Sequence, residues 1–87
     1  MVELEFEKVG DINTLFPYLC VYFKGGKEPF MEIGISDKEV VEYIFYPHAQ
    51  ELMLSSEQWN LIFSKGQVFL DVELKNKKFE DEWEASD

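Results

Sequence analysis

Apolar and charged residues alternate strictly over residues 2–8, where valine, leucine and phenylalanine are separated by glutamates. Successive side chains of a strand point to opposite faces, so this pattern predicts a strand with one buried side and one carboxylate side. Three glutamates on one side also suit an edge strand, because charge discourages pairing with another chain.

Three more segments, 18–24, 30–35 and 39–46, are rich in β-branched and aromatic residues and read as strands. Between the first two lies Gly25-Gly26, which predicts a two-residue type I′ hairpin because both central positions of that turn need positive φ. Ser36-Asp37-Lys38 predicts the second turn, and Pro47 ends the third segment. We therefore expect an antiparallel meander, with a short apolar run at 52–54 that can pair with it.

The clearest helix signal starts at Ser55, which is placed to form a capping box with Gln58. Trp59, Ile62 and Phe63 then recur at the spacing of one helical face. Since glycine is a common left-handed stop, Gly66 predicts the end of the helix after Lys65. The expected helix covers residues 56–65.

Beyond Gly66, residues 68–74 return to a period of two, which predicts another strand. Residues 76–78 read as a polar turn, and residues 79–87 read as an acidic tail. The fold class expected for residues 1–87 is a single α+β domain, an antiparallel sheet of about five strands with one α-helix packed on one face.

The chain has 87 residues and a net charge of −10, from 18 acidic residues and 8 lysines, with no arginine. A field of this sign repels nucleic acid and anionic membranes and attracts a basic protein. No apolar stretch approaches the ~20 residues of a membrane helix. The N-terminus lacks the basic and apolar regions of a signal peptide, so we expect a cytoplasmic protein.

Candidate chemistry is sparse. Cys20 and His48 are the single cysteine and the single histidine, and a thiol–imidazole pair would need the fold to bring them together. The alternative is a buried strand cysteine and a surface turn histidine. The carboxylates at 80–84 lack the glycine-containing loop of a calcium site. We predict no catalytic residue, no metal and no cofactor, and thus no enzyme.

The predicted sheet leaves one face open if the helix covers the other. The open face then carries aromatic residues beside carboxylates, a combination typical of protein-binding surfaces. Alternatively, the N-terminal strand, the tail or a second subunit of a homodimer covers this face. The candidate partner-binding residues are Tyr22, Phe30, Glu32, Glu42 and Tyr46, together with Trp83 in the acidic tail, which is the rival contact site.

Residues 29–70, containing PFMEIGISDKEVVEYIFYP and LMLSSEQWNLIFSKGQVFL, resemble small immunity proteins of bacterial contact-dependent and related polymorphic toxin systems. The resemblance lies in the order of elements and carries over no residue role. It implies an acidic protein that binds and blocks a basic toxin domain, often a nuclease. Two alternatives are a nucleic-acid mimic that inhibits a defence nuclease and a small adaptor domain with incidental acidity.

Overall fold

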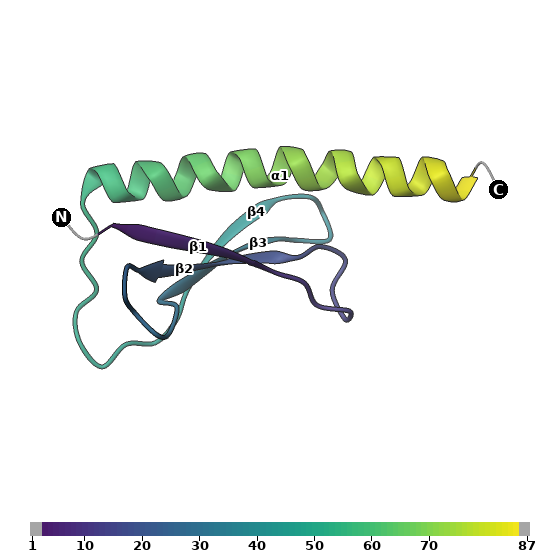
Figure 1. Ribbon diagram of the computed structural model, residues 1–87. Coiled ribbons are helices and arrows are strands. Elements are labelled where there is room, and N and C mark those ends of the chain that lie inside the picture. Colours follow the sequence, from purple (N-terminus) through teal and green to yellow (C-terminus); the bar gives the residue numbers. More distant parts are fainter. Residues whose placement is uncertain (1–2, 86–87) are drawn as a thin grey trace.

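The computed structural model describes the backbone of residues 3–85 and the side chains of residues 3–79. The chain forms an antiparallel sheet in the order β1-β2-β3-β4, and a single helix lies across one face (Figure 1). The α+β prediction is confirmed, with four strands in place of about five. The elements are β1 (Leu4–Val9), β2 (Tyr18–Phe23), β3 (Met31–Ile35), β4 (Val41–Phe45) and α1 (Ser56–Ala85).

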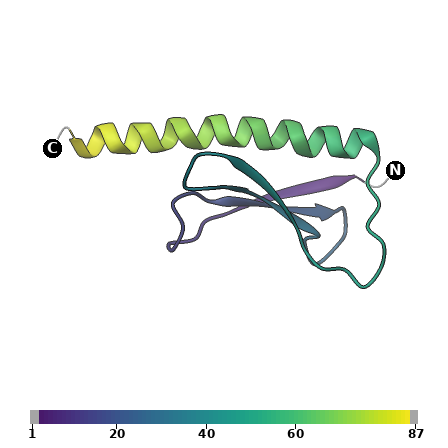
Figure 2. The same ribbon diagram turned by 180° about the vertical axis from the view of Figure 1, so that it is seen from behind.

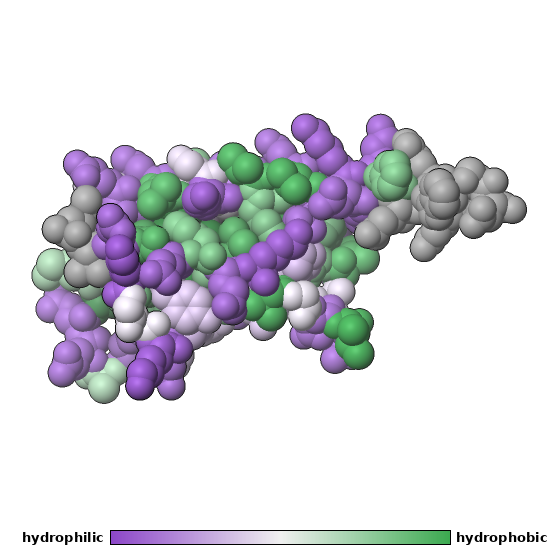
Figure 3. All heavy atoms as spheres, viewed as in Figure 1, coloured by the Kyte–Doolittle hydropathy of each residue, from purple (hydrophilic) through white to green (hydrophobic). Residues whose placement is uncertain are grey.

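The register of the meander brings the apolar side of every strand to the helix. Phe6 lies opposite Val21, Val21 opposite Met31, and Met31 opposite Phe45. Apolar side chains therefore fill the space between α1 and the strands. The buried apolar side predicted for the first strand is confirmed, because Leu4 and Phe6 pack against this core. On the surface, Figure 3 shows hydrophobic residues gathered in the middle of this side of the molecule, with hydrophilic residues around them. The fully buried cluster consists of Val21, Phe30, Met31, Ile33, Ile62 and Phe69.

The start of α1 follows the predicted capping box. The backbone N–H of Gln58 donates to Ser55 Oγ at 3.1 Å, and the N–H of Ser55 donates to Gln58 Oε1 at 2.8 Å. These two bonds satisfy N–H groups that have no partner within the helix. A local sequence signal thus fixes where the helix begins.

The end of the helix is not where the sequence predicts it. Helix α1 continues through Gly66 to Ala85, so the predicted end of the helix at residue 65, the strand at 68–74 and the turn at 76–78 are wrong. Residues 79–85 of the predicted acidic tail belong to this helix. Val68 and Val72 lie one turn apart on the exposed side, while Leu70 and Leu74 lie one turn apart nearer the sheet. Two such pairs, offset by two residues, imitate the alternation of a strand.

Gly66 is a packing residue and not a helix stop. It is buried, and a Cβ atom at this position would lie 2.5 Å from the hydroxyl oxygen of Tyr43. Since only glycine lacks that atom, Gly66 lets α1 approach β4 closely. The Tyr43 hydroxyl in turn donates to the carbonyl of Phe63, 3.4 Å away, in the preceding turn of the helix.

The loops also differ in part from expectation. The connection between β2 and β3 spans residues 24–30, and Gly25 has φ +84° whereas Gly26 does not have positive φ. With Gly26 N–H bonded to the carbonyl of Phe23 at 2.8 Å, Gly25 occupies the position that needs positive φ in a type II turn. The predicted type I′ turn is therefore wrong. Residues 52–54 form no strand, and Leu52 and Leu54 pack against the core.

Candidate partner-binding face

The sheet face opposite α1, called the outer face below, is covered by no helix or strand of the described residues (Figures 1 and 2). Successive side chains of a strand point to opposite faces of the sheet, so every second residue of each strand lies on the outer face. The outer face carries five carboxylates, three tyrosines, one cysteine and one exposed isoleucine: Glu3, Glu5, Glu7, Tyr18, Cys20, Tyr22, Glu32, Glu42, Ile44 and Tyr46.

Two tyrosine–glutamate hydrogen bonds order the centre of the outer face. The Tyr46 hydroxyl donates to Glu32 Oε1 at 3.0 Å, and the Tyr22 hydroxyl donates to Glu7 Oε1 at 3.4 Å. Cys20 lies directly opposite Glu7 on one side and opposite Glu32 on the other. At the usual strand separation, these two glutamates stand ~10 Å apart across the thiol.

The environment keeps the tyrosine hydroxyls protonated. The pKa of Tyr46 is raised, first by burial, then by its hydrogen bond to Glu32 and the charge of that carboxylate. The pKa of Tyr22 is also raised, by desolvation and by the charge of Glu7. Both hydroxyls therefore stay donors at neutral pH, and each holds its glutamate in place.

Cys20 is not placed as a nucleophile. Its side chain is buried, and burial together with the charges of Glu32 and Glu7 raises the pKa of the thiol. Because the thiolate is the reactive form, this environment favours an inert cysteine. The His48 ring instead lies 3.4 Å from the carbonyl oxygen of Phe30, so its hydrogen bond goes to backbone.

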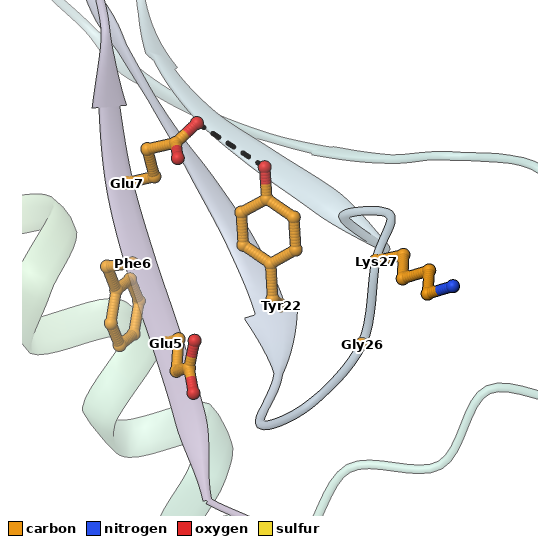
Figure 4. Close-up of a pocket in the computed structure, with 6 residues that line it drawn as sticks. All are labelled: Glu5, Phe6, Glu7, Tyr22, Gly26 and Lys27. Carbon is orange, nitrogen blue, oxygen red and sulfur yellow. Dashed lines mark hydrogen bonds between the residues drawn. The ribbon is translucent and has the colours of Figure 1, made fainter.

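A recess at one end of the outer face is open to solvent (Figure 4). Its volume is about 420 Å³, and it lies between β1, β2 and the turn that follows β2. Lys27 points away from the carboxylates, while Glu7 reaches toward Tyr22. The recess thus has the size and the charge to accept a lysine or arginine side chain beside Glu5 and Glu7. It is lined by Glu5, Phe6, Glu7, Tyr22, Gly26 and Lys27.

The outer face gathers four of the predicted partner-binding residues: Tyr22, Glu32, Glu42 and Tyr46. The placement of Phe30 is wrong, because its side chain is 2% exposed and stacks on Phe23 with ring centroids 4.3 Å apart. Phe30 precedes β3, so strand alternation does not decide its direction. The side chain of Trp83 lies outside the described residues, although its backbone belongs to α1.

Sequence reasoning missed that the glutamates of β1 join this face. Leu4 and Phe6 lie opposite Phe23 and Val21, so Glu5 and Glu7 are forced beside Tyr22 and Cys20. The signal was present, since pairing the first two strands as antiparallel neighbours with matched apolar sides gives this arrangement.

Other classes of site find no support in the described part of the chain. Within residues 3–79, no group of three or more histidine, cysteine, aspartate or glutamate side chains is arranged to hold a metal ion. The carboxylates at 80–84 lie beyond those side chains. Across the described residues, no helix combines the length and the apolar character that crossing a membrane requires.

Comparisons with protein-family models, curated proteins and solved structures give no match to this chain. The geometry and the charge of the outer face are therefore the features of this chain that indicate a function.

Proposed function

We propose that this protein is an immunity-type inhibitor that binds a basic toxin domain, most simply a nuclease, through its outer face. The observation that carries the proposal is the pairing of half-buried tyrosines with carboxylates on an uncovered sheet face. Tyr46 with Glu32 and Tyr22 with Glu7 form two such pairs. A face of this kind offers aromatic contact area and acceptors for lysine and arginine together.

Electrostatic attraction brings the basic partner toward this protein. The net charge of −10 attracts a basic protein over distances of about a Debye length and accelerates its association. On contact, the exposed carboxylates of Glu5, Glu7 and Glu42 accept hydrogen bonds from the basic side chains of the partner. Charged groups at the rim mainly set the association rate, whereas buried anchors set the dissociation rate.

The tyrosines are ordered before the partner arrives. Their hydrogen bonds to Glu7 and Glu32 restrict rotamers that would otherwise be lost on binding. Ordering a flexible side chain at an interface costs ~0.5–1.5 kcal/mol, so a preformed face retains more of its contact energy as affinity.

A nucleic-acid mimic is the second candidate, and one observation favours it. Glu3, Glu5 and Glu7 alternate along the exposed side of β1, which separates their carboxylates by ~7 Å. However, Glu3 is paired with Lys24 at 3.2 Å, and the neighbouring strand β2 carries Tyr18 and Tyr22 on this face and no carboxylate. Interleaved charge and aromatic area favour a protein surface over a row of phosphates.

Affinity capture from the native host, followed by co-expression, tests the proposed function. The captured partner is expected to be basic, to inhibit growth when expressed alone and to be neutralised by this protein. Neutralisation is expected to weaken with Glu42→Lys, and to persist with Asp71→Lys, which makes the same charge change on α1, away from the outer face. A partner that is harmless alone, or equal loss with both variants, would reject the immunity function.

A further inference from the structure

The two edges of the sheet differ sharply in chemistry. The segment 3–8 at the β1 edge contains four charged residues, Glu3, Glu5, Glu7 and Lys8, whereas Glu42 is the one charged residue of β4. Charges on an edge strand discourage pairing with another chain, and an apolar edge lacks this protection. The β4 edge is therefore the side of the sheet that can accept a further strand.

The backbone of β4 is oriented for such pairing. The bonds from Ser36 N–H to Val40 O and from Tyr46 N–H to Phe30 O bracket the β3–β4 ladder. Since bonded pairs alternate in an antiparallel ladder, the N–H and C=O groups of Val41, Tyr43 and Phe45 point away from β3. Among the described strands, none pairs with this edge.

An aromatic border, formed by Tyr43, Phe45, Trp59 and Phe63, runs beside the edge on the helix side. The ring centroids of Tyr43 and Trp59 are 5.4 Å apart, and those of Phe45 and Trp59 are 6.4 Å apart. Phe45 and Phe63 remain about half exposed, at 47% and 49%. The border thus leaves a large aromatic surface beside unpaired backbone, which a neighbouring strand and helix would cover.

We propose that β4 pairs with β4 of a second copy of this chain, antiparallel and with a two-fold axis at Tyr43. In this register Val41 lies opposite Phe45 of the second copy, Glu42 opposite Ile44, and Tyr43 opposite Tyr43. The backbone N–H and C=O groups of Val41, Tyr43 and Phe45, which point away from β3, then form hydrogen bonds across the junction. No carboxylate lies opposite another. A register centred on residue 42 shortens the overlap and places Glu42 against Glu42.

The β4 edge is self-complementary, because Glu42 is its one charged residue and lies opposite Ile44 in this register. Two chains that each carry −10 repel one another, so they approach most readily where local charge is lowest. The β4 edge meets this condition, and Asn60 and Gln67 on the adjoining part of α1 are uncharged as well. A closed two-fold contact also buries both aromatic borders and leaves no β4 edge free. The result is an eight-stranded sheet, with both outer faces on the side away from the two helices.

Sedimentation equilibrium of the full chain with opposed substitutions at one site tests this proposal. Ile44 is 42% exposed and lies on the outer face, so a charge there is tolerated by the core. Ile44→Glu places carboxylates opposite Glu42 of the second copy at both ends of the two-fold and should raise the dimer Kd about tenfold or more. Ile44→Lys creates two opposite-charge pairs and should leave the dimer as tight or tighter. Circular dichroism establishes that both variants keep the fold.

Val68→Lys is the matched control, because Val68 is 62% exposed on the helix surface away from β4. It should leave the dimer Kd unchanged within about threefold. A wild-type chain that stays monomeric at millimolar concentration overturns the proposal. So does a dimer that Val68→Lys dissociates, or one that responds equally to both Ile44 variants. None of these results bears on binding of a basic partner at the outer face, so the two proposals fail separately.

Discussion

The same four strands present two different surfaces. On the helix side, Val21, Met31 and Ile33 are completely buried and make the core, whereas on the outer side tyrosines and glutamates are held in pairs without a covering element. The alternation of residues along each strand therefore places the core on one face and leaves the other without a covering helix or strand of the described residues. This division predicts that substitutions on the two faces have separable effects.

The largest expected contrast is between two isoleucines on adjacent strands. Ile33 is fully buried and Ile44 is 42% exposed. Ile33→Ala should lower the free energy of unfolding by ~2–5 kcal/mol, because it removes buried methyl groups and leaves a cavity. Ile44→Ala should lower it by less than ~1 kcal/mol. Chemical denaturation measures both, and comparable losses would mean that the outer face is also core.

A second prediction concerns the helix-covered face of the sheet, where α1 packs closely against β4. Gly66→Ala places a methyl group against the Tyr43 ring, so it should destabilise the fold by ~1–3 kcal/mol despite the better helix propensity of alanine. In a Tyr43→Phe background the hydroxyl is gone and the loss should be smaller. If the two backgrounds give the same loss in a double-mutant cycle, Gly66 does not act through Tyr43.

A third prediction concerns Cys20, the buried group of the outer face. Burial and nearby carboxylates raise the pKa of the thiol above its ordinary value of 9.0, so the native state favours the protonated form. The resulting stability is complete below the pKa of the unfolded thiol and is lost as pH rises through the higher folded value. Unfolding followed across this alkaline range should show a steeper fall for wild type than for Cys20→Val. Parallel curves would show that Cys20 is not linked to folding.

The smallest effect is expected outside both faces, in the β3–β4 turn. Glu39 has φ +65°, a left-handed conformation that non-glycine residues adopt at a cost. Glu39→Gly relieves this strain and loses only a long, partly exposed ion pair with Lys77 at 3.9 Å. Thermal unfolding should report a gain of up to ~1 kcal/mol. A loss of stability would show that the ion pair outweighs the strain.

What the sequence predicts correctly is local. The capping box at Ser55 and Gln58, the first four strands and the face assignments follow from spacing within short segments. The end of α1 depended on a distant contact, since Gly66 is read as a stop until Tyr43 is known to lie against it. Glu73 is likewise buried in the helix because Lys8 of β1 reaches it at 2.7 Å.

In the candidate site, too, only the features that depend on local spacing could be predicted from the sequence. Tyr22, Glu32, Glu42 and Tyr46 could be placed on one face from alternation, but Phe30 could not, since it lies just before β3. Trp59 and Ile62 share the predicted apolar face of the helix, yet Ile62 is fully buried whereas Trp59 is 38% exposed beside Tyr43 and Phe45. Its replacement by alanine should accordingly cost less than the ~3–5 kcal/mol of a buried aromatic.

The most direct test of the outer face is the binding kinetics of the captured basic partner with Glu32→Lys and Asp71→Lys, measured over a range of salt. Both variants change the net charge equally, but Glu32 lies on the outer face and Asp71 on α1. Glu32→Lys should slow association and weaken affinity by about thirtyfold or more, which corresponds to about 2 kcal/mol or more of like-charge repulsion. Asp71→Lys should change affinity by less than about threefold. Equal effects of the two variants, with the fold intact, would contradict the assignment of binding to the outer face.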